Sequence, residues 1–210
     1  MNTQGMEDPG ERDLRRLQLA KRLVSHEART QTIYRLTGYT RHRLATLRRR
    51  WGVSRDYRHR GPAPTSFSAF FRSPRMRSEG ASAAAICRIF EAVVTRPYDR
   101  QHRDLNDLES GERLCEVYEA FHACFPGSAL EFDQLMLLAM GLSKKQVVGI
   151  GNCANCNCTI LADLLSKYQR TCPLCQRRSM STQDLKSTTE DQATEGNDAG
   201  EPGSTQGRLF

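Results

Sequence analysis

The chain has 210 residues, of which 38 % are hydrophobic and 26 % charged, so we expect one domain, or a domain with an appendage, around a small apolar core. Its apolar runs are too short to cross a bilayer and no secretory signal pattern is present. We therefore expect a cytoplasmic protein without membrane spans, whose cysteines are reduced. The formal net charge is +7, but residues 1–60 hold fifteen Lys/Arg against six Asp/Glu, and residues 179–210 hold two against six. This asymmetry favours a front half that binds a polyanion, with a merely solvated basic surface as the alternative.

The first predicted helix begins at Asp8. Asp8 is a good N-cap, Pro9 suits the first helical position, and Glu11 lies three residues after the cap. Apolar residues then recur at helical spacing: Leu14, Leu17, Ala20 and Val24. We expect this stripe to pack against a neighbouring helix or another subunit. The basic residues of the segment lie largely off the stripe: Arg12, Arg15, Arg16 and Arg22.

Two further helices are predicted at residues 27–37 and 41–51. Gly38 can adopt the left-handed conformation that ends the first of them. Thr40 is a good N-cap for the second, which Gly52 closes. Helix, short turn and helix in this order are typical of a helix-turn-helix unit, whose second helix enters the major groove of DNA. Tyr34, where many such units have alanine, departs from the pattern.

The predicted helix 41–51 is rich in arginine. At 100° per residue, Leu44, Leu47 and Trp51 share one face. The opposite face holds the residues expected to read base edges: His42, Thr46 and Arg49. Its flanks hold the residues expected to contact phosphates: Arg41, Arg43 and Arg50. The alternative is an arginine-rich helix that is only solvated.

The middle of the chain is predicted to be a connector followed by helices. Residues 58–80 are the connector, because their prolines oppose a continuous helix and their phenylalanines need cover from the core or a partner. Helices are then predicted from Ser82 to Val94, from Ser110 to Phe125, and from a Ser128-to-Glu131 capping box to Met140, where Gly141 ends the last one. Three cysteines within these apolar patterns are expected to be small core residues: Cys87, Cys115 and Cys124.

The C-terminal third carries two Cys-x-x-Cys pairs, Cys153 with Cys156 and Cys172 with Cys175, fifteen residues apart. This spacing is typical of a closed four-thiolate zinc site, and no histidine or carboxylate stands among the ligands, so we expect one structural Zn²⁺. Disulfides, incidental thiols and a redox-active dithiol are the alternatives. Cys158 is left out of the ligand set, because a single residue between it and Cys156 is a poor spacing for two ligands of one metal. Whether Cys158 is a ligand stays open. A short strand is predicted at 146–150, and the polar residues 179–210 are predicted to be disordered.

In this order, the segments resemble the FlhC family, the zinc-binding subunits of the bacterial flagellar master transcriptional activator. The resemblance covers about residues 10–178. Its most telling stretches are Leu36 to Leu44, Pro62 to Phe71, Asn152 to Cys156 and Thr171 to Cys175. It implies a hetero-oligomer with an FlhD-type subunit that binds double-stranded promoter DNA of flagellar (class 2) operons and helps recruit RNA polymerase. It also implies that the four paired cysteines hold the zinc. The acidic tail and Cys158 depart from the family pattern.

The expected fold is mainly α. Five segments are predicted: a helix-turn-helix-like region at 1–57, the connector at 58–80, a helical middle at 81–145, a zinc-bound, ribbon- or knuckle-like segment at 146–178, and the tail at 179–210. We do not expect an enzyme, because the chain lacks a glycine-rich phosphate loop and a nucleophile elbow. The expected function is a DNA-binding transcriptional activator subunit. The alternatives are a zinc-ribbon interaction module or a thiol redox switch that does not bind DNA.

Overall fold

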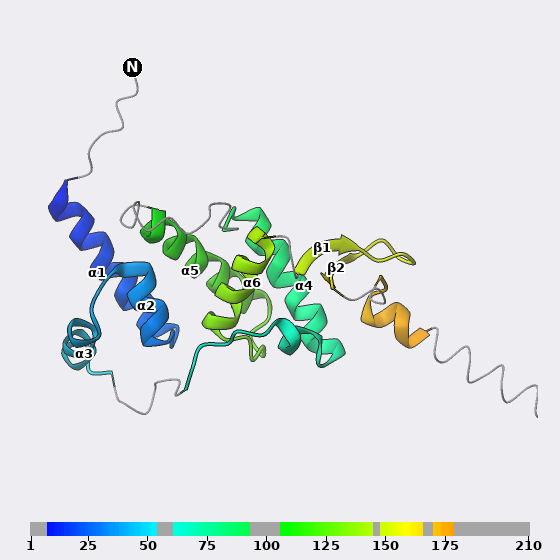
Figure 1. Ribbon diagram of the computed structural model, residues 1–210, viewed down its shortest axis with the longest axis horizontal. Coiled ribbons are helices and arrows are strands. Elements are labelled where there is room, and N and C mark those ends of the chain that lie inside the picture. The colour runs from blue at the N-terminus through cyan, green and yellow to red at the C-terminus, as the bar shows by residue number, and fades with distance from the viewer. Residues whose placement is uncertain (1–7, 54–60, 93–105, 145–147, 166–169, 179–210) are drawn as a thin grey trace, which may run out of the picture. The chain divides into compact units, whose positions relative to one another are not determined.

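The computed structural model describes residues 8–53, 61–92, 106–144, 148–165 and 170–178. The protein is mainly helical (Figure 1). In chain order its elements are α1 (Pro9–Ser25), α2 (Thr30–Thr37), α3 (Arg41–Arg50), the 3-10 helix η2 (Phe67–Phe71), α4 (Pro74–Ile89), α5 (Asn106–Cys124), α6 (Phe132–Lys144), β1 (Val148–Asn152) and β2 (Thr159–Asp163). By its contacts the chain divides into Met1–Pro173, which holds all these elements, and Leu174–Phe210. No helix in the described ranges is both long and apolar enough to span a membrane.

The ends of the first helices follow the capping residues. The Asp8 carboxylate accepts the N–H groups of Gly10 and Glu11 at 3.1 and 3.2 Å, and Pro9 is the first residue of α1. Thr40 caps α3 by accepting the N–H of Arg43 at 3.2 Å. Between them, α2 ends at Gly38, whose φ is +72°, in the left-handed region that favours glycine. These caps and ends are as predicted.

The start of α2 and the stripe of α1 differ from the expectation. Glu27 has a φ of +57°, which is incompatible with a right-handed helix at this residue. α2 therefore begins at Thr30 and not at 27. On α1, Ala20 and Val24 are buried, but Leu14 is 55 % exposed. The apolar stripe of α1 therefore contacts the core only in its C-terminal half.

The long helix α5 is central to the packing. It contacts α1 and α2 on one side and α4 and α6 on the other (Figure 1). Gly111 lies where α1 meets α5, and a Cβ at this position would stand 2.8 Å from Cδ2 of Leu19. Phe121 and Leu114 of α5 are fully or almost fully buried. The helix α3 packs on α2, which in turn packs on α5.

The predicted connector at 58–80 is partly helical. Ser73 caps α4 by accepting the N–H of Met76 at 3.1 Å, and Pro74 is the first residue of that helix. Proline is tolerated at this position because the first N–H groups of a helix have no intrahelical partner, so the prediction that Pro74 keeps this segment irregular was wrong. The predicted helix 82–94 instead runs from Pro74 to Ile89, whose side chain is 76 % exposed. The predicted end at Val94 lies outside the described residues.

The aromatic residues of the connector do pack on the core. Phe70 is fully buried, and Phe67 and Phe71 are half-buried against it. A Cβ on Gly141 would stand 2.5 Å from Cε1 of Phe67 and 2.7 Å from Cγ2 of Val148. Gly141 was predicted to end the preceding helix, but α6 continues to Lys144. The glycine instead lets α6 approach these two side chains closely.

Two other expectations about the middle helices were wrong. The Ser128-to-Glu131 box does not open α6. The Ser128 hydroxyl donates to Glu79 at 2.7 Å and accepts the N–H of Leu130, and α6 begins only at Phe132. Cys124 is exposed, because it lies at the C-terminal end of α5, beyond the part that packs.

Cys87 and Cys115 are fully buried, as expected of small core residues. Burial raises the pKa of each thiol to about 12, so both stay protonated at neutral pH.

The two strands form an antiparallel hairpin. Its register pairs Val148 with Asp163 and Asn152 with Thr159. The strand predicted at 146–150 is thus found at 148–152, and its partner β2 was not predicted. β2 packs on α4, and Leu161 is buried close to Gly80 of that helix. The hairpin carries the first cysteine pair in its connecting turn.

Candidate metal centre and candidate nucleic-acid interface

The turn between β1 and β2 presents the first cysteine pair. The N–H of Cys153 donates to the carbonyl of Cys158 at 2.8 Å, and the N–H of Asn157 donates to the carbonyl of Cys153 at 2.9 Å. Asn157 has a φ of +58°, a conformation that asparagine tolerates better than most residues. The backbone therefore closes on itself within six residues and holds Cys153 and Cys156 on one turn.

The second pair is brought to this turn by backbone contacts. The N–H of Ala154 donates to the carbonyl of Arg170 at 2.9 Å, and the N–H of Cys172 donates to Sγ of Cys153 at 3.2 Å. Arg77, which is buried on α4, donates to the carbonyl of Thr171 at 3.1 Å. Arg77 thereby ties the second pair to the helical body, a contact that the sequence pattern does not show.

Four cysteines form one close group: Cys153, Cys156, Cys172 and Cys175. Their Sγ atoms all lie within 4.8 Å of one another, and those of Cys156 and Cys172 are 3.7 Å apart. A tetrahedral thiolate site with metal–sulfur bonds of about 2.3 Å needs sulfurs about 3.8 Å apart. The group therefore fits one metal ion. It contains the four cysteines predicted from the spacing, and Cys158 is outside it.

The surroundings of Cys153 favour a ligand thiolate. Hydrogen bonds from the backbone N–H groups of Cys156 and Cys172 lower the pKa of Cys153 to about 6, against the opposing effect of burial. The thiolate is the form that binds metals. Cys153 and Cys172 are buried whereas Cys156 is exposed, so the group is closed on one side and reachable on the other.

No protein-family model matches this chain, and no curated protein matches it significantly. The metal centre is therefore characterised by its own geometry. Sulfur ligands alone, with no histidine or carboxylate in the group, are typical of structural sites and not of catalytic ones.

The predicted DNA-binding residues all lie on α3. Five of the six side chains are exposed: Arg41, His42, Arg43, Arg49 and Arg50. The sixth, Thr46, is half-buried; its hydroxyl donates to the carbonyl of His42 at 3.2 Å and accepts from Nη2 of Arg49 at 3.4 Å. α3 contains no acidic residue, so its outward face is positively charged. The inward face is formed by Leu44 and Leu47, as predicted.

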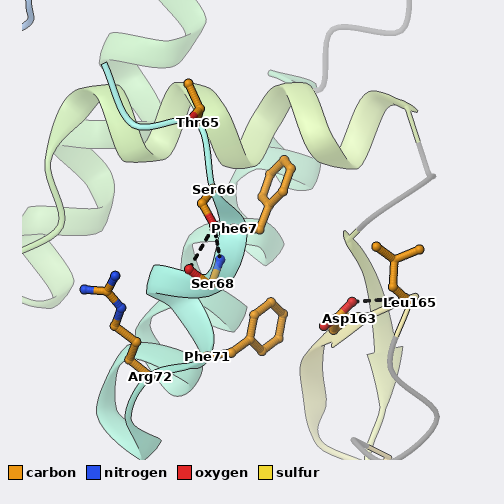
Figure 2. A pocket seen from close by; sticks show the side chains of 8 residues that line it. All are labelled: Thr65, Ser66, Phe67, Ser68, Phe71, Arg72, Asp163 and Leu165. Atoms are coloured by element: carbon orange, nitrogen blue, oxygen red, sulfur yellow. Dashed lines mark hydrogen bonds between the residues drawn. The ribbon is translucent and has the colours of Figure 1, made fainter. Parts of the chain in front are cut away.

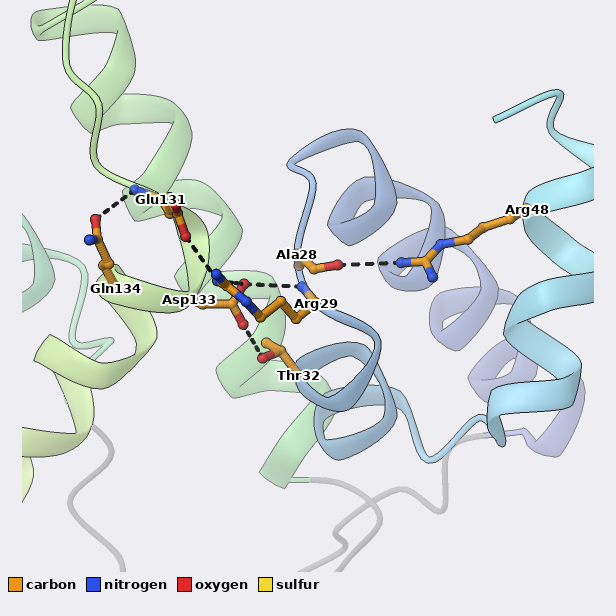
Figure 3. Close-up of polar contacts among 7 residues, drawn as sticks. All are labelled: Ala28, Arg29, Thr32, Arg48, Glu131, Asp133 and Gln134. Carbon is orange, nitrogen blue, oxygen red and sulfur yellow. Dashed lines mark hydrogen bonds and ion pairs between the residues drawn. The ribbon is translucent and has the colours of Figure 1, made fainter. Parts of the chain in front are cut away.

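Arg48 is a functional candidate that the sequence analysis missed. It is only 5 % exposed. Its Nη1 donates to the Thr30 hydroxyl at 2.8 Å and its Nη2 to the carbonyl of Ala28 at 3.4 Å, so it holds α3 against the start of α2 (Figure 3). The signal was present in the sequence, because Arg48 follows Leu44 by four positions and so shares its buried face.

The segment that Arg48 contacts is itself held by α6. The backbone N–H of Arg29 donates to Asp133 at 3.0 Å, and its guanidinium pairs with Glu131 at 2.8 Å (Figure 3). The Thr32 hydroxyl donates to the other oxygen of Asp133. A continuous set of polar contacts therefore runs from α3 through residues 28–32 to the first turn of α6.

Part of the positive charge of the front half is used inside the fold. Arg15 pairs with Glu112 and Arg22 with Glu119, each at 2.6 Å. Together with Arg29, these arginines hold the first helices on α5 and α6. These arginines are already paired with carboxylates of the protein. The positive charge that can contact a polyanion is therefore more concentrated on α3 than the count of basic residues in the front half suggests.

A cleft of about 600 Å³ lies between η2 and the end of β2. Phe67 and Phe71 form one wall and Asp163 and Leu165 the other (Figure 2). The Ser66 hydroxyl donates to that of Ser68 at 2.8 Å, so these polar groups are satisfied within the connector. The cleft thus lies between the aromatic connector and the hairpin that carries Cys153 and Cys156, and its volume is in the range of small-ligand pockets.

Proposed function

We propose that this chain is a DNA-binding subunit of a transcriptional activator of the FlhC type. The observation that carries the proposal is α3: an exposed face of four arginines and a histidine, on a helix whose opposite face is held by Leu44, Leu47 and Arg48. A positively charged helix that follows a short turn and is fixed from behind suits insertion into the major groove. The target in this proposal is the promoter DNA of flagellar (class 2) operons.

The residues of α3 divide into two roles in this proposal. Arg41, Arg43 and Arg50 contact phosphates, which gives affinity without sequence preference. Three such contacts predict a slope of about −2.7 for the logarithm of affinity against the logarithm of salt concentration. Arg49 and His42 reach base edges and carry the preference, because an arginine can donate two hydrogen bonds to guanine.

Thr46 is the weakest of the proposed base-reading residues. Its hydroxyl already has two partners on α3, His42 and Arg49. We therefore assign Thr46 a contact through its methyl group, while Arg49 must exchange its bond with Thr46 for a bond to DNA.

The proposed metal is one Zn²⁺ on the four paired cysteines, supported by the all-sulfur ligand set and the sulfur spacing. Zinc would supply a fixed cross-link between the two Cys-x-x-Cys turns. Within the chain, Cys172 and Arg77 do the positioning: the first donates its N–H to Cys153, and the second holds the carbonyl of Thr171. The proposed role of the centre is structural, and the protein is proposed not to be an enzyme.

The proposed partners are an FlhD-type subunit and RNA polymerase. Large apolar side chains stand exposed on the helices, among them Leu14 on α1 and Ile89 at the end of α4. Exposed apolar residues near the ends of packed helices suit a protein interface, where burial would be favourable. The family resemblance and these side chains are the support for a hetero-oligomer.

The test is a binding assay of the zinc-loaded complex with its FlhD-type partner, on a flagellar promoter duplex and a scrambled duplex. Arg49→Ala is expected to weaken promoter binding by about 10- to 100-fold, because a base contact is worth about 1–3 kcal/mol. Scrambled DNA should be affected far less. Arg88→Ala, an exposed arginine on α4, is the matched control and should change neither. Equal losses on both duplexes would remove Arg49 from base reading, and no binding by the wild-type complex would refute the proposed function.

A second candidate is an interaction module that does not touch DNA. It is favoured by Leu164 and Leu165, which are exposed directly after β2 beside the metal-bearing hairpin. In this case, Leu165→Ser should abolish binding to the partner protein, whereas Arg49→Ala should have no effect on any activity of the complex.

A further inference from the structure

A fifth cysteine stands beside the four-cysteine group. Cys158 follows Cys156 by two positions on the same turn, yet it is not a member of the group. Cys156 and Cys158 are both exposed, whereas Cys153 and Cys172 are buried. One ligand of the metal centre is therefore both open to small reagents and next to a thiol that the metal does not need.

The backbone allows these two cysteines to be joined. Residues two apart in a turned segment have Cα atoms about 5–7 Å apart, and a disulfide needs about 4.4–6.8 Å. Asn157 between them is turned, with a φ of +58°. The turn is closed independently by the bond from the N–H of Cys153 to the carbonyl of Cys158, which does not involve any side chain. A disulfide between the two sulfurs therefore requires only a local change in the turn that carries them.

We propose that Cys156 and Cys158 form a peroxide-sensitive oxidation site that reversibly opens the metal centre. In the first step, the Cys156 thiolate attacks one oxygen of hydrogen peroxide, the O–O bond breaks, and a sulfenic acid and hydroxide form. In the second step, the Cys158 sulfur attacks the Cys156 sulfur, the S–O bond breaks, and a disulfide forms; the departing hydroxide takes the proton of the Cys158 thiol and leaves as water. The two thiols together lose two electrons, and the peroxide is reduced to two waters.

The consequence for the centre is the loss of one of its four ligands. Once Cys156 is in a disulfide it has no thiolate to offer, so the remaining cysteines hold the metal less tightly. A thiol reductant restores both thiols and with them the site. The inference rests on the proposed metal ligation, and it is independent of DNA binding.

The test uses the zinc-loaded full chain treated with hydrogen peroxide. Released zinc is measured with a chromogenic chelator, and disulfides are mapped by mass spectrometry without reduction. The wild type is expected to release zinc as a Cys156–Cys158 disulfide forms, and to rebind it after reduction. Cys158→Ser is expected to release zinc at least about fivefold more slowly, because the other thiols near Cys156 are metal ligands, two of them buried. Cys124→Ser removes an exposed cysteine of α5 and should behave as the wild type.

If a variant does not fold, mapping the disulfides of the oxidised wild type is by itself a test of the proposal. Disulfides that join only ligand cysteines, such as Cys153 with Cys172, would overturn the proposal, and so would equal release rates in the wild type and Cys158→Ser. Because neither readout involves DNA, a failure of the DNA-binding proposal leaves this test intact. A chain that purifies without zinc would instead refute the proposed metal, and the oxidation proposal with it.

Discussion

The guanidinium of Arg22 lies 2.6 Å from the carboxylate of Glu119 and joins α1 to α5 across 97 positions of the chain. The same separation recurs one heptad earlier, where Arg15 pairs with Glu112. Two pairs with equal offsets mean that α1 and α5 run in the same direction and in register. His26 contacts the Glu119 carboxylate as well, at 2.7 Å. Arg15 and Arg22 therefore dock α1 on α5.

The Arg22 contact makes a modest contribution to stability. Two hydrogen bonds, from Nε and Nη2, join it to Glu119, but both side chains are partly exposed. Arg22→Gln should therefore lower the free energy of unfolding by about 0.5–1 kcal/mol. Denaturant unfolding measures this, with Lys21→Gln, an exposed neighbour, as the control. Equal effects of the two substitutions would mean that the pair contributes nothing specific.

Stability should fall on acidification in two stages. Burial lowers the pKa of His26 from its usual 6.5, against the opposing hydrogen bond with Glu119. The hydrogen bond from Arg22 lowers the pKa of Glu119 from 4.5. Each group binds fewer protons in the folded state than in the unfolded state. Its contribution to stability is therefore complete above its ordinary pKa, and is lost as the pH falls from that value through the lowered pKa of the folded state.

The first loss should begin as pH drops below 6.5 and the second below 4.5. Unfolding free energies at a series of pH values, with zinc held constant, test this. In His26→Gln, the unfolding free energy should depend less on pH than in the wild type between pH 7 and 5, and equally at lower pH. An unchanged profile in His26→Gln would show that other groups, such as the cysteine ligands, govern the acid sensitivity.

Arg48 should matter for both stability and recognition. Arg48→Met keeps the aliphatic stem but leaves the Ala28 carbonyl without this donor inside the fold. The expected loss is about 1–3 kcal/mol of unfolding free energy, typical of a buried polar group left unsatisfied. Promoter affinity should fall as well, because α3 loses its fixed position. Arg50→Met, at the exposed end of the same helix, should weaken phosphate binding while leaving stability unchanged, and an identical stability loss would contradict the positioning role.

Metal binding and folding of the hairpin should be coupled through Cys153. Cys153→Ser removes a buried ligand that also accepts the N–H of Cys172. We expect substoichiometric zinc and a lower melting temperature, because the free energy of metal binding contributes to folding. Cys124→Ser is the matched control. Full zinc content with an unchanged melting temperature in Cys153→Ser would refute the structural role of the site.

The features predicted well from sequence are those fixed within a few residues. Asp8, Gly38 and Thr40 act through neighbouring N–H groups or their own φ, so their types reveal helix ends directly. The errors occurred where one residue type has two uses. Pro74 can break a helix or begin one, and Gly141 can end a helix or admit a neighbouring side chain; only the tertiary packing decides between them.

The same distinction applies to the candidate sites. The cysteine spacing predicted the close four-cysteine group because two Cys-x-x-Cys turns constrain their own geometry. The sequence could not reveal that Arg77 holds Thr171, because the two lie 94 positions apart. The helix face of Leu44 could have distinguished the buried Arg48 from the exposed Arg49, but the sequence could not reveal the bonds of Arg48 to Thr30 and Ala28. Long-range contacts depend on packing that no local pattern encodes.

The contacts that secure the first helices have a consequence for synthesis on the ribosome. Arg15, Arg22 and Arg29 meet partners 97 to 102 positions later in the chain. At about 5–20 residues per second, the N-terminal helices wait roughly 5–20 s for α5 and α6 to emerge. During that interval α1 and α2 lack the cover that α5 gives their apolar faces in the folded protein. Newly made N-terminal segments should therefore be ready substrates for a chaperone, and the segment that supports α3 gains its Asp133 contact only after residue 133 has been made.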